Sequence, residues 1–220
     1  MDTISFGLIS EGVSEHNIIK HIIARFLGDD NCRIRQIQPE VNKDGKQASY
    51  GGWLGVLKYC REENFNNILS VNDYIVIQID TDTSEEIGYD VKKTKENNVL
   101  KTGEELYNDI CKRLLKNISA EKRREYADKI LFAICFNEIE CWLLPLYYTD
   151  RTKCNTTNCI RKLNQKIELK IPDKDKNSPN AQRAYQKILK KLRNPEKIKA
   201  CSEHNTGFRK FVEQLNKINN

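Results

Sequence analysis

Residues 74–82 read Tyr-Ile-Val-Ile-Gln-Ile-Asp-Thr-Asp, an apolar run that ends in two aspartates. Its first six residues are almost continuously apolar and rich in β-branched side chains, which is typical of a parallel strand buried on both faces. A parallel sheet brings the carboxyl ends of its strands to one edge, where α/β proteins bind their ligands. The stretch therefore predicts a central strand whose end delivers Asp80 and Asp82 to a functional edge.

Three further segments have the length and apolar character of strands, at residues 4–9, 33–38 and 130–136. Helical patterns separate them. Strands that alternate with helices indicate parallel pairing with right-handed crossovers. We therefore predict an α/β fold whose parallel four-stranded sheet is flanked by helices.

The helical segments carry recognisable start and stop signals. Ser14 is expected to cap the first helix, and Gly28 to end it. A second helix follows Gly51-Gly52, and the capping box Thr102-Gly-Glu-Glu105 opens a third. A short helical segment is expected near residues 120–128.

Beyond Asp150 the patterns are helical only, and the chain becomes strongly basic. Residues 151–220 contain 18 Lys or Arg and 6 Asp or Glu, a net charge of +12, whereas residues 1–150 contain 19 and 25, a net charge of −6. We divide the chain into a body, residues 1–150, and a basic helical appendage, residues 151–220. Helices are expected near 156–168, from 178 to about 193, and near 206–218, and residues 170–178 form the expected loop or linker.

This charge asymmetry favours contact between the appendage and a polyanion such as nucleic acid. Five basic residues on the expected helix from residue 178 are the candidates, with Tyr185 interleaved: Arg183, Lys187, Lys190, Lys191 and Arg193. Contacts of this kind position a nucleic acid strand without reading its sequence. The alternative is a solvated lysine-rich helix surface.

The sequence contains no apolar run close to the roughly 18 residues that a membrane helix needs, and its first three residues lack the basic region of an export signal. Of its eight cysteines, Cys111, Cys135 and Cys141 lie in apolar patterns that suit buried free thiols. We therefore expect a cytoplasmic protein with no membrane contact, kept in a reducing compartment.

A zinc site would need ligands from two distant pairs of residues, Cys154 with Cys159 and Cys201 with His204. The first spacing is wide for a zinc knuckle, and the second pair lies far along the chain. Chance pairing is the better interpretation in a chain with this many cysteines. The sequence leaves zinc binding by these four residues open.

Carboxylates follow three of the expected strands. They are Glu11 after the first, Asp80 and Asp82 after the third, and Glu138 and Glu140 after the fourth. Mg²⁺ prefers carboxylate oxygens and bridges them to phosphate oxygens, and Mn²⁺ accepts the same ligands. A nearby glutamate adds a ligand or transfers a proton. The pattern indicates a metal site suited to phosphoryl transfer.

A strand, Glu11-Gly12, a helix and then a strand ending in Asp80-Thr-Asp82 resemble the Toprim fold of topoisomerases, bacterial primases and the overcoming-lysogenization-defect nucleases. This resemblance spans about residues 4–145. It implies acid-base chemistry for Glu11 and magnesium binding by Asp80 and Asp82. Glu138 and Glu140 are expected near the site, although residues two apart on a helix point in nearly opposite directions.

More narrowly, Glu11-Gly12-x-Ser14-Glu15 together with Glu138-x-Glu140-x-Trp142-Leu-Leu is similar to small Toprim-like proteins often associated with phage defence. The resemblance implies a magnesium-dependent nuclease that cleaves DNA or RNA. It leaves room for a protein partner such as an ATPase encoded nearby, because nothing here resembles the ATPase half of larger relatives. No tyrosine stands out as a topoisomerase nucleophile, so hydrolysis is the simpler reaction.

Two alternatives remain. The stretch from Ile75 to Thr83 also resembles the nucleophile motif of haloacid-dehalogenase phosphatases, in which Asp80 would attack phosphate and Asp82 would act as the acid. That chemistry has no need of Glu11. The second alternative is a non-catalytic subunit of a defence complex that only binds nucleic acid or protein.

Overall fold

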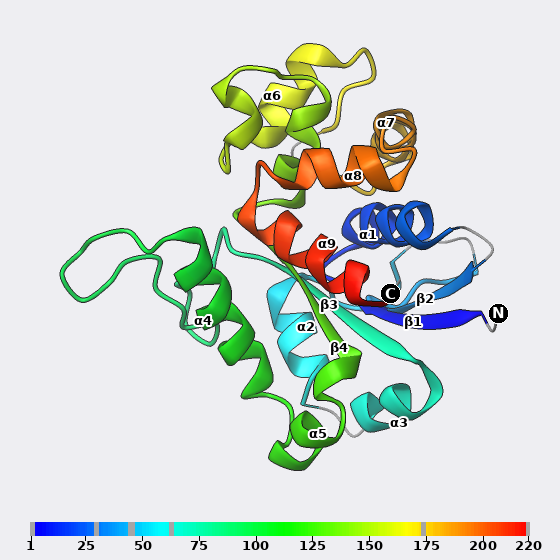
Figure 1. Ribbon diagram of the computed structural model, residues 1–220, viewed down its shortest axis with the longest axis vertical. Helices are drawn as coiled ribbons and strands as arrows, with labels where there is room; N and C mark the ends of the chain where they lie inside the picture. Colours follow the sequence, from blue (N-terminus) through cyan, green and yellow to red (C-terminus); the bar gives the residue numbers. More distant parts are fainter. Residues whose placement is uncertain (1–2, 29–30, 44–46, 62–63, 173–174, 219–220) are drawn as a thin grey trace.

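A computed structural model describes residues 3–28, 31–43, 47–61, 64–172 and 175–218. Within them, a four-stranded sheet is formed by β1 (Ile4–Ile9), β2 (Cys32–Gln38), β3 (Tyr74–Asp80) and β4 (Ile130–Cys135). Its order is β2-β1-β3-β4, and every pairing is parallel. The predicted α/β class, with a parallel sheet flanked by helices, is confirmed (Figure 1).

The strand order places a topological switch between β1 and β3. From β1 the chain moves outward to β2, and it then returns to pair β3 with the other side of β1. Connections that leave two neighbouring strands in opposite directions open a crevice beyond their carboxyl ends. The residues that follow β1 and β3 therefore face each other across this crevice.

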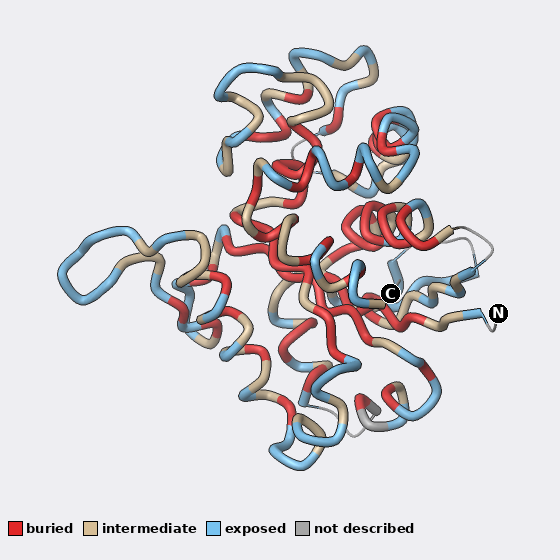
Figure 2. The backbone as a smooth tube through the Cα atoms, in the orientation of Figure 1, coloured by how far each residue is buried: buried red, intermediate tan, exposed pale blue. Residues whose placement is uncertain are grey.

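One face of the sheet is covered by α1 (Val13–Leu27) and by three helices from the C-terminal third of the chain (Figure 1). These are α7 (Pro179–Leu189), α8 (Pro195–Ser202) and α9 (Thr206–Ile218). Figure 2 shows the buried backbone concentrated between these helices and the strands. Within this core the Trp142 ring stacks on Phe208, with centroids 4.6 Å apart.

The opposite face is covered by α2 (Gly52–Tyr59), α3 (Asn64–Val71) and α4 (Gly103–Leu115). The capping box at Thr102 and Glu105 is present, as the sequence predicts. Helix α3 was not expected, because its run of asparagines weakens the helical pattern. After α4 come the short α5 (Ala120–Glu125) and a single 3₁₀ turn, η2 (Ala127–Lys129).

The chain between β4 and α7 consists of short helices: η3 (Ile139–Leu146), η4 (Arg151–Cys154) and α6 (Cys159–Lys166). The segment η3, which follows β4, is a 3₁₀ helix with Pro145 inside it. Helix α6 is shorter than the helix expected at 156–168. Residues 173 and 174 of the expected linker at 170–178 lie outside the described residues.

Segments on both sides of residue 150 share one hydrophobic core, which includes α1, β4, η3 and the helices from α6 to α9. Gly207, in the first turn of α9, allows this helix to lie directly against the backbone of β4. A Cβ atom there would lie 1.9 Å from the carbonyl oxygen of Ile134. The C-terminal helices thus pack directly on the sheet.

Two helix boundaries differ from those expected. Gly12 is the N-cap residue of α1, and Ser14 already lies inside the helix, so Ser14 does not cap it. The expected helix from 178 to 193 is divided, because α7 ends at Leu189 and Pro195 starts α8 after the N-cap Asn194. The Ser178-Pro179 start is confirmed.

The connection from β3 to α4 extends away from the body of the protein as a long loop (Figures 1 and 2). Three large apolar side chains of this connection are exposed: Ile87, Val99 and Leu100. Among the described residues, no helix has both the length and the apolar character required to cross a bilayer.

Candidate active site

Glu11 joins the ends of β1 and β3. Its backbone N–H donates to the side-chain oxygen of Gln78 at 3.0 Å, and its own Oε1 accepts from the backbone N–H of Asp80 at 2.6 Å. Gln78 is fully buried, and its Nε2 donates to Asp80 Oδ1 at 2.9 Å. One buried amide thus fixes both the glutamate backbone and the aspartate carboxylate at the switch between the strands.

The two aspartates of β3 and its following turn occupy different environments. Asp80 is 7% exposed, and its carbonyl oxygen accepts from the Tyr89 hydroxyl at 3.0 Å. Asp82 is exposed and accepts from the Thr83 backbone N–H at 2.8 Å. Lys93 from the long loop donates to the Asp82 carbonyl oxygen at 2.9 Å, which holds the start of the loop beside the site.

Glu15 belongs to the same cluster, although the sequence analysis assigned it no role. It lies in the first turn of α1, and its side chain is 8% exposed. Its carboxylate folds back over the N-terminus of the helix, where a Cβ on Gly12 would lie 2.4 Å from Glu15 Oε2. The spacing of four residues from Glu11, across a glycine, was the signal available in the sequence.

Glu138 and Glu140 both lie near the site, and they have different contacts. Glu138 Oε1 accepts from the backbone N–H groups of Cys159 at 2.5 Å and Ile160 at 3.3 Å, so it caps the start of α6. Glu140 is fully buried, and it accepts a hydrogen bond from the Tyr185 hydroxyl. Glu138 therefore holds the start of α6, and Glu140 holds α7 through Tyr185.

Lys176 places a cation among these carboxylates. Its Nζ lies 3.1 Å from Glu140 Oε2 and 3.8 Å from Glu15 Oε1, and its side chain is 25% exposed. Burial lowers the pKa of Lys176, but the negative charges of Glu140, Glu15 and Asp80 outweigh that effect and raise it overall. Sequence reasoning missed this residue because it lies in a polar loop without a motif.

Burial and mutual repulsion raise the pKa values of the clustered acids. Burial raises the pKa of Glu11 to about 8; the hydrogen bond from Asp80 opposes this rise, while the charges of Glu15 and Asp82 add to it. The pKa of Asp80 is raised well above its ordinary value by burial and by the Glu11 and Glu15 charges. Burial also raises the pKa of Glu138, with Glu140 adding to the effect.

A cavity of about 510 Å³ opens beside this cluster. Asp80, Asp82 and Glu138 line it with carboxylates, while Lys176 and Arg161 add positive charge. A phosphate group that enters the cavity meets cations, and a metal ion meets oxygen ligands. This combination suits a site that binds a charged phosphate ester.

The carboxylates lie in one region, but their oxygen atoms are not gathered closely enough to coordinate one metal ion. In the part of the chain that the structure describes, the one group of three Cys, His, Asp or Glu ligand atoms within 4.8 Å of one another is Glu138, Cys141 and Cys159. Cys141 and Cys159 form a disulfide, so Cys141 is not the free thiol expected from the sequence. Cys154, Cys159, Cys201 and His204, for which the sequence left zinc binding open, are likewise not gathered among the described residues.

The five basic candidates of the appendage are all exposed. They lie on α7 and in the turn that follows it: Arg183, Lys187, Lys190, Lys191 and Arg193. Lys191 lies over the Tyr147 ring, 3.9 Å from its centroid. Tyr185, which was expected to lie among these cations, is instead 1% exposed and points to Glu140. It therefore supports the carboxylate cluster.

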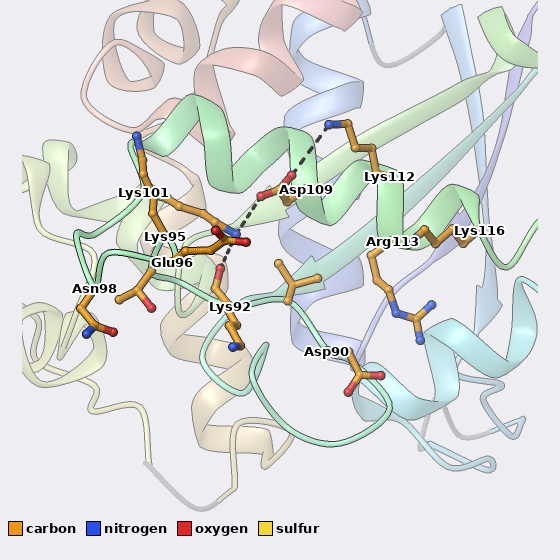
Figure 3. A pocket seen from close by; sticks show the side chains of 12 residues that line it. Asp90, Lys92, Lys95, Glu96, Asn98, Lys101, Asp109, Lys112, Arg113 and Lys116 are labelled. Atoms are coloured by element: carbon orange, nitrogen blue, oxygen red, sulfur yellow. Dashed lines mark hydrogen bonds and ion pairs between the residues drawn. The ribbon is translucent and has the colours of Figure 1, made fainter.

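A second cavity, of about 550 Å³, lies between the long loop and α4 (Figure 3). Many of its lining residues are basic, but several of these cations are already paired. Lys101 lies 2.8 Å from Asp109, Lys95 lies 2.6 Å from Glu105, and Arg113 donates to the Tyr89 carbonyl oxygen at 2.8 Å. Because these pairs fasten the loop to the helix, we assign this cavity a structural role.

Fold and site together define a parallel α/β protein with an acidic cluster at the switch point of its sheet. Comparison with known proteins adds no relative, because no protein-family model, no curated protein and no solved structure matches the chain.

Proposed function

We propose that this protein is a metal-dependent nuclease of the Toprim type, which hydrolyses phosphodiester bonds of DNA or RNA. One observation carries the proposal. The carboxylate of Glu11, after β1, accepts from the backbone of Asp80, at the end of β3, inside a cluster of acidic residues. This is the juxtaposition that the Toprim resemblance requires at the edge where parallel sheets bind ligands.

The acidic residues supply the oxygen donors that Mg²⁺ or Mn²⁺ prefers. Glu11, Asp80 and Asp82 would hold the ion. Burial, together with neighbouring carboxylates, raises the pKa values of Glu11 and Asp80, and a divalent cation would offset the clustered negative charge. To bind the ion, the carboxylates of Glu11 and Asp80 must give up hydrogen bonds that they accept within the protein. When bound, the ion would polarise a phosphoryl oxygen and lower the pKa of water.

The remaining residues then have distinct tasks. The pKa of about 8 belongs to Glu11 without the ion; binding of the ion would lower this pKa, so Glu11 would release its proton and act as an ionised ligand. Lys176 and Arg161 line the same cavity as Asp80 and offer positive charge to a phosphate. Glu138 and Glu140 act as positioning residues, because their oxygens are bonded to α6, Lys176 and Tyr185.

A nucleic acid substrate agrees with the exposed cations of α7 and with the net charge of +12 of residues 151–220. The narrower resemblance to Toprim-like proteins of phage defence supports a role against foreign genetic elements. In this proposal residues 1–150 supply the carboxylates, residues 151–220 add Lys176 and Arg161 to the same cavity, and the basic C-terminal helices both cover the sheet and bind the polyanion.

The test compares Asp80→Ala with Asp128→Ala. Asp128 is an exposed aspartate in η2, just before β4 and so near the amino ends of the strands. Purified wild-type and variant proteins are incubated with plasmid DNA and with structured RNA, each with Mg²⁺, Mn²⁺ or EDTA. We expect cleavage by the wild type and by D128A with metal, and loss of at least about 100-fold in D80A. Equal activity in the two variants would refute the proposal.

The alternatives predict other outcomes. A haloacid-dehalogenase-type phosphatase would release phosphate from a monoester and would tolerate Glu11→Gln, because its chemistry has no use for Glu11. A non-catalytic binding subunit would show no metal-dependent cleavage in any variant, and its nucleic acid binding would fall when the cations on α7 are reversed.

A further inference from the structure

A third cavity, of about 580 Å³, adjoins the carboxylate cluster on its β2 and α2 side. Its lining comes from two distant parts of the chain, the segment just before α2 and the residue that follows Lys176. The lining residues are Gln47, Ala48, Ser49, Tyr50, Gly51 and Asn177. None of these side chains is charged, in contrast to the cavity that contains Asp80.

Two contacts fix this cavity to the proposed active site. The backbone N–H of Gly52 donates to the Glu11 carbonyl oxygen at 2.8 Å, and a Cβ on Gly51 would lie 2.3 Å from that same oxygen. On the other wall, Ser14 Oγ donates to Asn177 Oδ1 at 3.2 Å. A ligand in the cavity would therefore lie beside the Glu11 backbone.

Tyr50 presents an aromatic surface at the cavity. It is 94% exposed, and it is the one exposed aromatic side chain among the described residues. Its backbone is anchored, because Gln38 Nε2 donates to the Tyr50 carbonyl oxygen at 2.6 Å. A ring on a fixed backbone offers a stacking surface at low entropic cost.

The other polar groups of the cavity match the edge of a nucleobase. Gln47 Nε2 donates to the Ser49 carbonyl oxygen at 3.0 Å, and Gln47 Oε1 accepts from Asn177 Nδ2 at 3.4 Å. Each amide still has a further hydrogen and a further lone pair to offer. Mixed donors and acceptors suit a base edge, whereas a phosphate would call for cations.

We propose that this cavity binds the unpaired nucleobase next to the scissile phosphodiester, with Tyr50 stacking on the base and Gln47 and Asn177 facing its edge. The inference rests on the proposed nuclease function and deepens it. It assigns the cavity to unpaired stretches of a nucleic acid, because a base within a duplex has neither its face nor its pairing edge free.

The experiment measures binding separately from cleavage. Fluorescence anisotropy is recorded in EDTA with a labelled single-stranded oligonucleotide, with the same strand carrying abasic sites, and with the duplex. Proteins are the wild type, Tyr50→Ala, Tyr50→Trp and the control Leu54→Ala, an exposed apolar residue of α2 that is 63% exposed. Both exposed positions are expected to tolerate substitution, and thermal denaturation verifies folding.

We expect Y50A to weaken binding of the intact single strand about tenfold, as for the loss of one stacked base, with Y50W and L54A close to the wild type. The abasic strand should bind the wild type and Y50A equally. Equal binding of the intact strand by Y50A and the wild type, or a wild-type preference for duplex, would overturn the inference. If D80A still cleaves while Y50A loses base binding, the proposed nuclease site fails and the cavity stands only as a nucleobase-binding site. If D80A loses cleavage while Y50A binds like the wild type, the cavity assignment alone fails.

Discussion

The substitution Glu11→Gln is expected to stabilise the metal-free protein while it abolishes the proposed activity. Glutamine keeps an oxygen that can accept from the Asp80 backbone N–H, so the hydrogen bond survives. It removes an ionisable carboxyl group from a cluster that already contains Asp80 and Glu15. Stability and function are thus predicted to change in opposite directions.

The magnitude follows from the pKa of Glu11, which rises from 4.5 to about 8 on folding. Each pH unit of separation corresponds to about 1.4 kcal/mol, so Glu11 costs on the order of 3 kcal/mol at pH 7, where it is ionised in the unfolded chain and mostly protonated in the folded protein. Part of Glu11 reaches solvent, so we expect a measured gain of about 1–2 kcal/mol. That gain corresponds to a rise in Tm of roughly 2–8 °C for a chain of this size.

The pH dependence has a definite sign. Because the folded pKa of Glu11 lies above the unfolded value, its favourable contribution is complete below pH 4.5 and is lost as the pH rises toward 8. Glutamine does not titrate. The advantage of Glu11→Gln should therefore be near zero at pH 4.5 and should grow steadily up to pH 8.

Urea and thermal denaturation at pH 5 and pH 7.5 provide the assay, with Glu121→Gln as the control. Glu121 is an exposed glutamate of α5, outside the cluster. Mg²⁺ should raise the Tm of the wild type more than that of Glu11→Gln. A Glu11→Gln protein that is less stable than the wild type at pH 7.5, or whose gain is the same at both pH values, would refute the reasoning.

Three further substitutions test the packing around the site. Lys176→Gln leaves two buried carboxylates without their cation and should cost about 2 kcal/mol in urea denaturation at pH 7; an unchanged midpoint would contradict the role given to this lysine. Replacing both Cys141 and Cys159 by serine opens a link across 18 residues and should cost about 3 kcal/mol without reductant, with the difference from the wild type vanishing in dithiothreitol. A difference that persists in dithiothreitol would mean that the disulfide is not its source. Gly207→Ala should lower Tm strongly, because its new methyl group would collide with the Ile134 carbonyl oxygen, and a normal Tm would show that α9 does not approach β4 this closely.

The positions of the four strands could be predicted from the local sequence. Each strand was predicted within a residue or two. β1, β3 and β4 are largely apolar runs, which is typical of parallel strands covered on both faces, whereas β2 alternates polar and apolar residues. Parallel geometry then placed Glu11, Asp80 and Asp82 at one edge, and the structure brings the Glu11 carboxylate onto the Asp80 backbone. These residues could be found from order along the chain alone.

Tertiary packing decided the rest of the site. Lys176 and Tyr185 lie in a polar loop and on a basic helix, and only the packing of α7 against α1 and η3 directs them to Glu140 and Glu15. Their sequence surroundings resemble those of any solvated lysine or tyrosine. Strand periodicity is a property of neighbouring residues, whereas burial of a charge depends on which distant carboxylates lie beside it, and that depends on the whole fold.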